Sequence, residues 1–288
     1  MKPLSEGLTK GYIAYLEHFS MDARGKMSNS ALNGQRKSGA KGSSMEFSDF
    51  REYSTGDDLR RIDWNSYART DKLFTKVFLE EKQAEINIFL DCSASMGIDE
   101  EKGFYAKLIA ASIAYIALKN SDSVNIYAWS EGLKQWRLNN TSRNNFAQIV
   151  TFLDELEFSG QTRLSQSIGS AVVKSGRGIS VVISDFFIEE EFKESVDRLR
   201  YKKQQISMVQ VLSCEDAKPS VGGNRRLTDC ETGEYRDITV NERLLSDYQK
   251  VLSHMQAAMK EYCKMVDANF STVVTNVPLE ECVKKLFY

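Results

Sequence analysis

The chain has 288 residues, a formal net charge of -2 and 42% hydrophobic residues. This length and composition predict a buried core in one large domain or two modest domains. The balanced charge excludes a globally basic nucleic-acid binder. The longest apolar run, around 108–118, is shorter than the roughly 20 residues that cross a bilayer, and the N-terminus has no apolar signal region. We therefore expect a cytoplasmic protein that does not insert into a membrane.

The cysteines and histidines argue against a disulfide framework and against a zinc site. His18 and His254 form no H-E-x-x-H motif. The cysteines are odd in number, widely spaced and without a C-x-x-C pair: Cys92, Cys214, Cys230, Cys263 and Cys282. We expect reduced thiols, with Cys92 as a small buried apolar residue.

Residues 1–84 are predicted to form an N-terminal arm and a small β-rich subdomain. Residues 1 to about 20 have the apolar spacing of a short amphipathic helix, and 24–45 are rich in Gly, Ser, Lys and Arg, which is typical of an exposed arm. From Glu46 to about Lys82, aromatic residues and mixed charges precede a strand-like stretch at 73–79. We do not expect the basic arm to bind nucleic acid, because the chain has no broad positive surface.

Residues 85–288 alternate between strand and helix patterns. Short apolar runs predict strands at 86–90, 124–129, 179–183, 206–212 and 270–274, with hairpins near 135–136 and within 227–238. Helical spacing is found at 103–119, 144–156, 164–172, 192–199, 244–262 and after Pro278. This alternation predicts an α/β fold with an open, mostly parallel sheet and helices on both faces.

Oxygen-bearing side chains follow the first and third of these strands. Asp91, Ser93 and Ser95 alternate directly after the strand at 86–90, so an extended loop would point all three to one side. Asp185 follows the strand at 179–183, and Thr162 lies in a loop before a helix. Carboxylate and hydroxyl oxygens are ligands for Mg²⁺, Ca²⁺ or Mn²⁺. The alternative is a strand-end turn in which these side chains satisfy backbone groups.

These five residues resemble the metal-ion-dependent adhesion site of von Willebrand factor A domains. Its pattern is D-x-S-x-S, then a Thr, then an Asp, and this sequence matches it in order with Asp91, Ser93, Ser95, Thr162 and Asp185. The resemblance implies a von Willebrand factor A-like, Rossmann-like fold over 85–288. It also implies a divalent cation, Mg²⁺ before Ca²⁺ or Mn²⁺, that binds an acidic residue of a partner protein.

A second resemblance covers most of the chain from about Phe47 onward. The run 229–234 and a segment with many matching residues are similar to a bacterial family called "domain of unknown function 58". The matching residues of that segment are Arg51, Tyr53, Gly56, Asp57, Arg60, Asp63, Trp64, Ala68 and Arg69. Members of this family are commonly encoded beside MoxR-type AAA+ ATPases, so the resemblance implies such an ATPase as a partner.

Four charged residues of the N-terminal segment have two open interpretations. Arg51, Arg60, Asp63 and Arg69 either form a network of charge-assisted hydrogen bonds that holds the β-rich subdomain on the following domain, or form a partner-binding surface. Trp64 is interpreted as a packing anchor.

Two functions from different classes are compatible with the oxygen-bearing residues. The first is a non-enzymatic, metal-dependent protein-binding adaptor, in which the cation keeps a coordination position for a partner's carboxylate. The second is a metal-dependent phosphohydrolase with Asp91 as nucleophile. A strand that ends in Asp91 resembles the haloacid-dehalogenase type, which usually has another aspartate two residues on; this chain has Ser93 there, so the adaptor is favoured.

Overall fold

The computed structural model describes residues 2–21, 27–29, 45–80, 84–129, 133–137, 143–161, 164–175, 178–230 and 233–287. The chain forms two compact units. One unit combines Met1–Gly34 with Ala84–Tyr288, and the other is Gln35–Gln83. This division differs from the predicted one, which grouped residues 1–84, because the N-terminal segment packs with the α/β unit.

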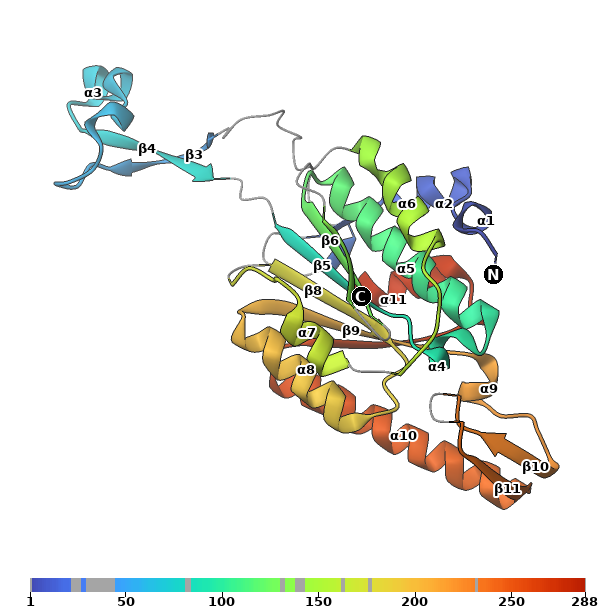
Figure 1. The fold of residues 1–288 in the computed structure, drawn as a ribbon. Helices are drawn as coiled ribbons and strands as arrows, with labels where there is room; N and C mark the ends of the chain where they lie inside the picture. The colour runs from blue at the N-terminus through green and yellow to red at the C-terminus, as the bar shows by residue number, and fades with distance from the viewer. Residues whose placement is uncertain are drawn as a thin grey trace. The chain divides into compact units, whose positions relative to one another are not determined.

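A six-stranded sheet with the order β12-β9-β8-β5-β6-β7 is the centre of the first unit (Figure 1). Its strands are β5 Glu85–Asp91, β6 Ser123–Trp129, β7 Leu133–Arg137, β8 Gly178–Ser184, β9 Gln204–Leu212 and β12 Asn269–Val274. All pairs are parallel except β6 with β7, which is antiparallel at one edge. The predicted α/β, Rossmann-like sheet is confirmed, including the hairpin after β6.

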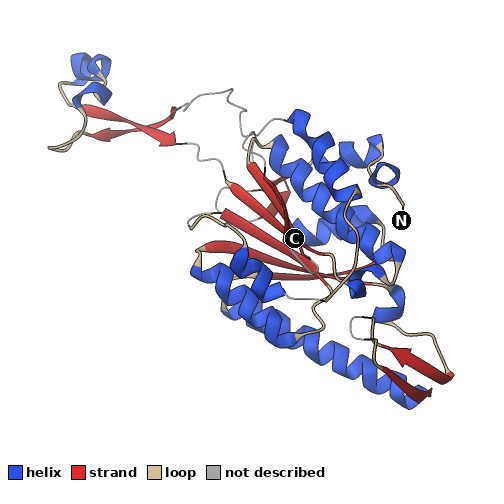
Figure 2. Ribbon diagram, in the orientation of Figure 1, coloured by secondary structure: helices blue, strands red, loops and turns tan. Residues whose placement is uncertain are grey.

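Helices cover both faces of the sheet (Figure 2). One face is covered by α5 Glu100–Lys119, α6 Phe146–Asp154 and α11 Leu279–Phe287, and the other by α7 Leu164–Ser170, α8 Glu189–Tyr201 and α10 Glu242–Met265. The alternation of side chains along β5 explains the two layers, since Ile88 and Leu90 belong to the core under α5 and Phe89 to the core under α8. Such two-sided burial is why the strand is apolar throughout.

The N-terminal residues are part of the core under α5. Two short helices, α1 Leu4–Gly7 and α2 Lys10–Leu16, replace the single predicted helix. Leu4 and Leu16 are fully buried in this core, and the Leu4 amide donates to Asp154 Oδ1 at 3.0 Å. A short antiparallel pair, β1 Phe19–Met21 and β2 Met27–Asn29, follows. The N-terminal segment therefore belongs to the α/β unit, because its apolar side chains pack in the core of that unit.

A short helix and a hairpin follow β9. The helix is α9 Cys214–Ala217, and the hairpin consists of β10 Gly223–Thr228 and β11 Tyr235–Val240. The predicted hairpin is confirmed, and most of its residues are exposed. None of the helices in the described part of the chain has the length and apolar character needed to cross a bilayer.

The second unit contains an antiparallel pair of strands, β3 Met45–Glu52 and β4 Phe74–Glu80. Between them lie a 3-10 turn, η1 Leu59–Arg61, and a short helix, α3 Trp64–Thr70. The predicted β-rich subdomain is thus a two-stranded ribbon with helical turns in its connection. Residues 30–44 of the predicted basic arm lie outside the described residues.

Candidate functional site

Asp91 is the last residue of β5, and its carboxylate is fully buried. Both carboxylate oxygens accept hydrogen bonds: Oδ1 from the Ser93 amide at 2.9 Å and Oδ2 from Ser184 Oγ at 2.6 Å. Ser184 is the last residue of β8, which pairs with β5 in parallel. The parallel register thus brings the polar ends of two strands together, at the edge of an α/β sheet where ligands commonly bind.

The loop after Asp91 turns at once into α4 Ala94–Gly97. Ser93 precedes this helix, and its hydroxyl lies 3.0 Å from the hydroxyl of Ser95. Cys92 is buried in the core under α5, as its position between the polar residues predicts. The hydrogen bond from the Ser93 amide to the Asp91 carboxylate is the bond expected for a strand-end turn, which is the alternative interpretation of this motif. The turn and a cation site remain compatible, because hydroxyl and carboxylate oxygens each have further lone pairs.

The loop after α6 lies beside the Asp91 loop. The Ala94 amide donates to the Gly160 carbonyl at 3.0 Å, and the Ser159 amide donates to the Cys92 carbonyl at 2.9 Å. Thr162, the fourth predicted ligand, lies outside the described residues. Its place at the site therefore stays a prediction.

Asp185 directly follows β8 and is 3% exposed. Its backbone carbonyl accepts from Gln210 Nε2 at 2.9 Å, and its Oδ2 accepts from Lys102 Nζ at 2.9 Å. The next residue, Phe186, is buried with a φ of 52°, a left-handed conformation that is unfavourable for a bulky side chain. Packing holds the chain in this sharp turn directly after Asp185.

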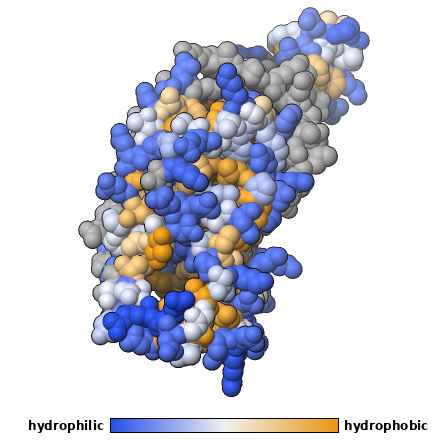
Figure 3. Space-filling view, turned by 90° about the vertical axis from the view of Figure 1, so that its right-hand side faces the viewer, coloured by the Kyte–Doolittle hydropathy of each residue, from blue (hydrophilic) through white to orange (hydrophobic). Residues whose placement is uncertain are grey.

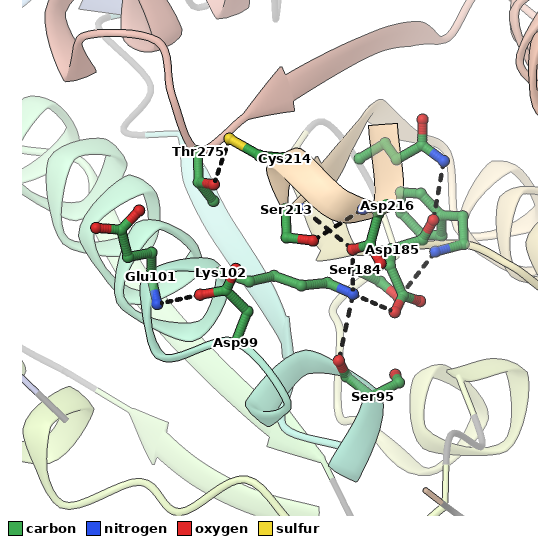
Figure 4. A network of polar contacts seen from close by, with 12 residues as sticks. Ser95, Asp99, Glu101, Lys102, Ser184, Asp185, Ser213, Cys214, Asp216 and Thr275 are labelled. Atoms are coloured by element: carbon green, nitrogen blue, oxygen red, sulfur yellow. Dashed lines mark hydrogen bonds and ion pairs between the residues drawn. The ribbon is translucent and has the colours of Figure 1, made fainter. Parts of the chain in front are cut away.

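Lys102 is the central residue that the sequence interpretation missed. It lies in the first turn of α5, and its side chain is 3% exposed. Its ammonium contacts Asp185 Oδ2 at 2.9 Å, Asp216 Oδ2 at 3.0 Å and the Ser95 carbonyl at 3.2 Å (Figure 4). The only signal in the sequence is a lysine next to the start of a helix that is apolar almost all round.

Asp216 was also missed, because it lies in a helix of four residues. Its side chain and that of Ser213 form a reciprocal capping box at the start of α9. Its backbone carbonyl accepts from the Tyr248 hydroxyl at 2.7 Å. The Ser213-x-x-Asp216 spacing is visible in the sequence as a capping-box pattern, but it does not show that Asp216 contacts Lys102.

The buried charges perturb one another. Burial, reinforced by the negative charge of Asp185, raises the pKa of Asp91 to about 7, although the bonds from Ser184 and Ser93 oppose the rise. Burial acts to lower the pKa of Lys102, but the carboxylates of Asp185 and Asp216 outweigh burial and raise it. Lys102 is therefore a charged ammonium, and Asp91 repels Asp185 when both are ionised.

The donor set fits a hard divalent cation. With Asp91, Asp185 and Asp216 all ionised, the three carboxylates and the Lys102 ammonium have a formal charge of -2, which a divalent cation would neutralise. The residues that could hold it are Asp91, Ser93, Ser95 and Asp185, all with oxygen donors. Within the described ranges no three or more His, Cys, Asp or Glu side chains are grouped to bind a metal. A cation here would therefore depend on hydroxyls and water, as Mg²⁺ commonly does.

A cavity of about 630 Å³ opens beside these residues. Ser95 and Asp185 line one side of it, and Leu227 and Arg236 of the β10–β11 hairpin line another. Its apolar wall includes Ile98, which is 71% exposed. Figure 3 shows hydrophobic residues gathered around a hollow on this face. The cavity can therefore accept an apolar group next to a polar one.

The predicted partner-binding residues of the second unit pair with close neighbours. Arg51 Nη2 donates to Asp57 Oδ1 at 2.6 Å, and Arg60 makes two bonds of 3.0 and 3.1 Å to the Asp58 carboxylate. The bond from Arg60 holds the pKa of Asp58 below its usual value. These are local, solvent-facing pairs of the kind that contribute little to stability.

Asp63 and Arg69 are likewise engaged near their own positions. Asp63 Oδ2 accepts from Ser66 Oγ at 2.6 Å, and this bond lowers the pKa of Asp63. Arg69 Nε donates to the Asn65 carbonyl at 3.2 Å. Trp64 is 61% exposed within this unit and contacts the Tyr67 ring edge to face, so its role as a packing anchor stays a prediction. The four charged residues contact their neighbours and do not contact one another in the described bonds.

Most of the chain matches one known protein family. The model of the family "Protein of unknown function DUF58" matches residues 49–258. The chain belongs to this family. Uncharacterized proteins of Mycobacterium bovis and Mycobacterium tuberculosis are 22% identical to the DUF58 chain over 223 residues, which cover 75% of this chain and 70% of each relative. The family resemblance drawn from Arg51 to Arg69 is therefore confirmed.

Several solved structures resemble part of this DUF58 protein. A conserved hypothetical protein, BatB from Bacteroides thetaiotaomicron, has 15% identity and a TM-score of 0.39 over 70% of this chain and 98% of its own. Proximal thread matrix protein 1 from the mussel byssus has 12% identity and a TM-score of 0.42 over 71% of this chain and 46% of its own.

Proposed function

We propose that this DUF58 protein is a non-enzymatic, divalent-metal-dependent protein-binding adaptor. Asp91, Ser93, Ser95 and Asp185 hold the cation, with Thr162 as a further predicted ligand. When bound, the cation supplies an electrophilic position for a carboxylate of a partner protein. Mg²⁺ is the expected cation, and Ca²⁺ and Mn²⁺ have the same preference for oxygen.

The observation that carries this proposal is the convergence of two buried carboxylates at the carboxyl edge of the sheet. Asp91 and Asp185 are each at most 3% exposed, and burial together with the charge of Asp185 raises the pKa of Asp91. A buried pair of like charges is unfavourable unless a cation or a proton relieves it. Lys102 bonds Asp185 and Asp216 but makes no described bond to Asp91, so Asp91 is the carboxylate whose charge a bound cation would neutralise.

The cavity beside the site supports a protein ligand. Its lining combines Ser95 and Asp185 with apolar side chains such as Ile98 and Leu227, and the cavity is larger than one carboxylate group requires. We expect an acidic residue of the partner at the cation and a neighbouring apolar side chain in the cavity. The partnership with a MoxR-type AAA+ ATPase rests on the family resemblance, and the adaptor would deliver a client to that ATPase.

The phosphohydrolase alternative gains no support from the geometry. The described hydrogen-bond donors to Asp91 are the Ser93 amide and the Ser184 hydroxyl, and neither is a carboxylic acid that could act as general acid or base. Ser93 stands where that chemistry usually requires an acid, and its hydroxyl lies next to Ser95. We therefore favour binding over catalysis.

The proposal is tested by affinity purification of the full chain from its host in Mg²⁺ and in EDTA. In Mg²⁺ the wild type is expected to capture both a client protein and a MoxR-type ATPase. In EDTA it should capture neither. Asp91→Asn should lose the partner in both buffers. Asp122→Asn is a matched control, because Asp122 is also a buried aspartate but accepts from the Ala84 amide at the amino ends of the strands. Capture that ignores EDTA and Asp91→Asn would contradict the metal bridge.

A further inference from the structure

Lys102 makes an unusually complete set of contacts for a lysine. An ammonium has three N–H donors, and Lys102 has three acceptors within reach: Asp185 Oδ2, Asp216 Oδ2 and the Ser95 carbonyl. They come from three different segments: the end of β8, the start of α9 and α4. Because a buried ammonium is costly unless it is paired, these contacts hold it firmly in place.

Two of these three acceptors belong to residues of the candidate cation site. Lys102 bonds the Asp185 oxygen that points into the network, and it also bonds the backbone of Ser95 (Figure 4). A metal that uses Asp185 must share this carboxylate with an ammonium or displace it. The third acceptor, Asp216, is outside the candidate ligand set and is held by its capping box.

We infer that Lys102 is a built-in cation that competes with the divalent metal for Asp185 and thereby sets the metal affinity of the site. This inference rests on the proposed metal site. In the metal-free protein, Lys102 neutralises Asp185 and keeps the edge folded. Asp216 provides the ammonium with a second carboxylate, so that Lys102 remains paired when the metal takes Asp185. The site thus binds metal reversibly, although both of its carboxylates are buried.

The helix α5 offers a matched control for Lys102. Lys107 lies one to two turns further along and is also buried, but it donates to the carbonyls of Leu156 and Asp154, at 2.6 and 3.3 Å. Replacing Lys107 removes a buried ammonium from the same helix without removing a partner of Asp185. A difference between the two variants therefore reports the contact with the site.

The test is isothermal titration of the metal-free full chain with Mn²⁺ and with Mg²⁺. Lys102→Met keeps an unbranched side chain and removes the charge, and it should bind both ions at least about tenfold more tightly, since one opposite charge shifts the proton affinity of a carboxylate by about that factor or more. Lys107→Met should keep the wild-type affinity. In EDTA the melting temperature of Lys102→Met should fall below that of the wild type, and Mg²⁺ should raise it by more than it raises the wild type.

A second variant keeps the inference testable if Lys102→Met does not fold. Asp216 has a side chain that is 27% exposed, so Asp216→Asn should be tolerated. The variant leaves Asp185 as the one remaining carboxylate partner of Lys102 in the network. Because Lys102 then holds Asp185 more strongly, the affinity for Mn²⁺ should fall by about threefold or more. Unchanged or tighter binding by Asp216→Asn would overturn the competition.

The outcomes separate this inference from the proposed function. If the wild type binds metal and Lys102→Met binds it equally or more weakly, the inference falls and the metal site stands. If Lys102→Met alone binds metal, Lys102 takes the place of the cation in the wild type, which supports the inference and contradicts metal-dependent capture. If neither protein binds metal, both ideas are wrong.

Discussion

Asp91→Asn should stabilise the metal-free protein at alkaline pH. Burial and the charge of Asp185 raise the pKa of Asp91 from 3.8 to about 7 in the folded state. Above pH 7 the Asp91 carboxylate is ionised in the folded and in the unfolded protein. The folded protein is then destabilised by the full free energy of holding a buried, ionised carboxylate near Asp185. Each pH unit between the two pKa values corresponds to about 1.4 kcal/mol, so the penalty is up to about 4 kcal/mol. Asparagine removes the charge and keeps a similar shape.

The sign of the pH dependence follows from the raised pKa. As the pH rises from about 4 to 7, the unfolded chain loses the Asp91 proton before the folded protein does, so the wild type loses stability over this window. Well below the unfolded pKa of 3.8 both states are protonated, and wild type and Asp91→Asn should be equally stable. The advantage of the variant should therefore grow from a small value at pH 4 to its full value at pH 8.

Urea unfolding in EDTA, followed by circular dichroism at pH 4, 6 and 8, measures this difference. The slope of the free energy against urea should be the same in both proteins, so that the midpoint reports stability. Asp122→Asn should show no such gain at pH 8, because Asp122 accepts a backbone amide in a different part of the sheet. A variant less stable than wild type at pH 8 would refute the account of repulsion between buried carboxylates.

Three further substitutions test other parts of the structure. Leu4→Ala should destabilise the protein by about 2–5 kcal/mol in urea unfolding, because Leu4 is fully buried under α5, and an effect under 0.5 kcal/mol would contradict the packing of α1 on this core. Gly97→Ala would place a Cβ 2.5 Å from Phe158 Cβ and should lower the free energy of unfolding by about 1–3 kcal/mol. An unchanged melting temperature would show that α4 does not contact the loop around Phe158. Leu227→Asp lies on the cavity and is 52% exposed, so it should leave stability within about 0.5 kcal/mol of wild type but reduce partner capture in Mg²⁺; undiminished capture would remove the cavity from the binding surface.

The sheet could be predicted because its strands are buried on both faces. The apolar run 86–90 ends at Asp91, and the run 179–183 ends near Asp185, so the sequence marks both the strands and the edge at which their polar ends meet. Parallel pairing then makes the proximity of the two aspartates a consequence of topology. Periodicity of this kind is visible in a single sequence.

The network around Lys102 could not be predicted, because its partners are far apart in the chain. Lys102, Asp185 and Asp216 come together only when α5, β8 and α9 are in place, and no local pattern links them. The N-terminal helices were assigned to the wrong unit for a related reason. Their apolar spacing predicts a buried face, but only the tertiary structure shows that Leu4 and Leu16 contact the core under α5.

The central claim is that a divalent cation binds between the ends of β5 and β8. The most direct measurement is an anomalous difference map from crystals of the full chain grown with Mn²⁺. The account predicts a peak at roughly 2 Å from the oxygens of Asp91 or Asp185 and of the serines at 93 and 95, with Lys102 withdrawn from Asp185 or sharing it. A map without a peak at this edge, with Lys102 still bound to Asp185 at millimolar Mn²⁺, would contradict the claim.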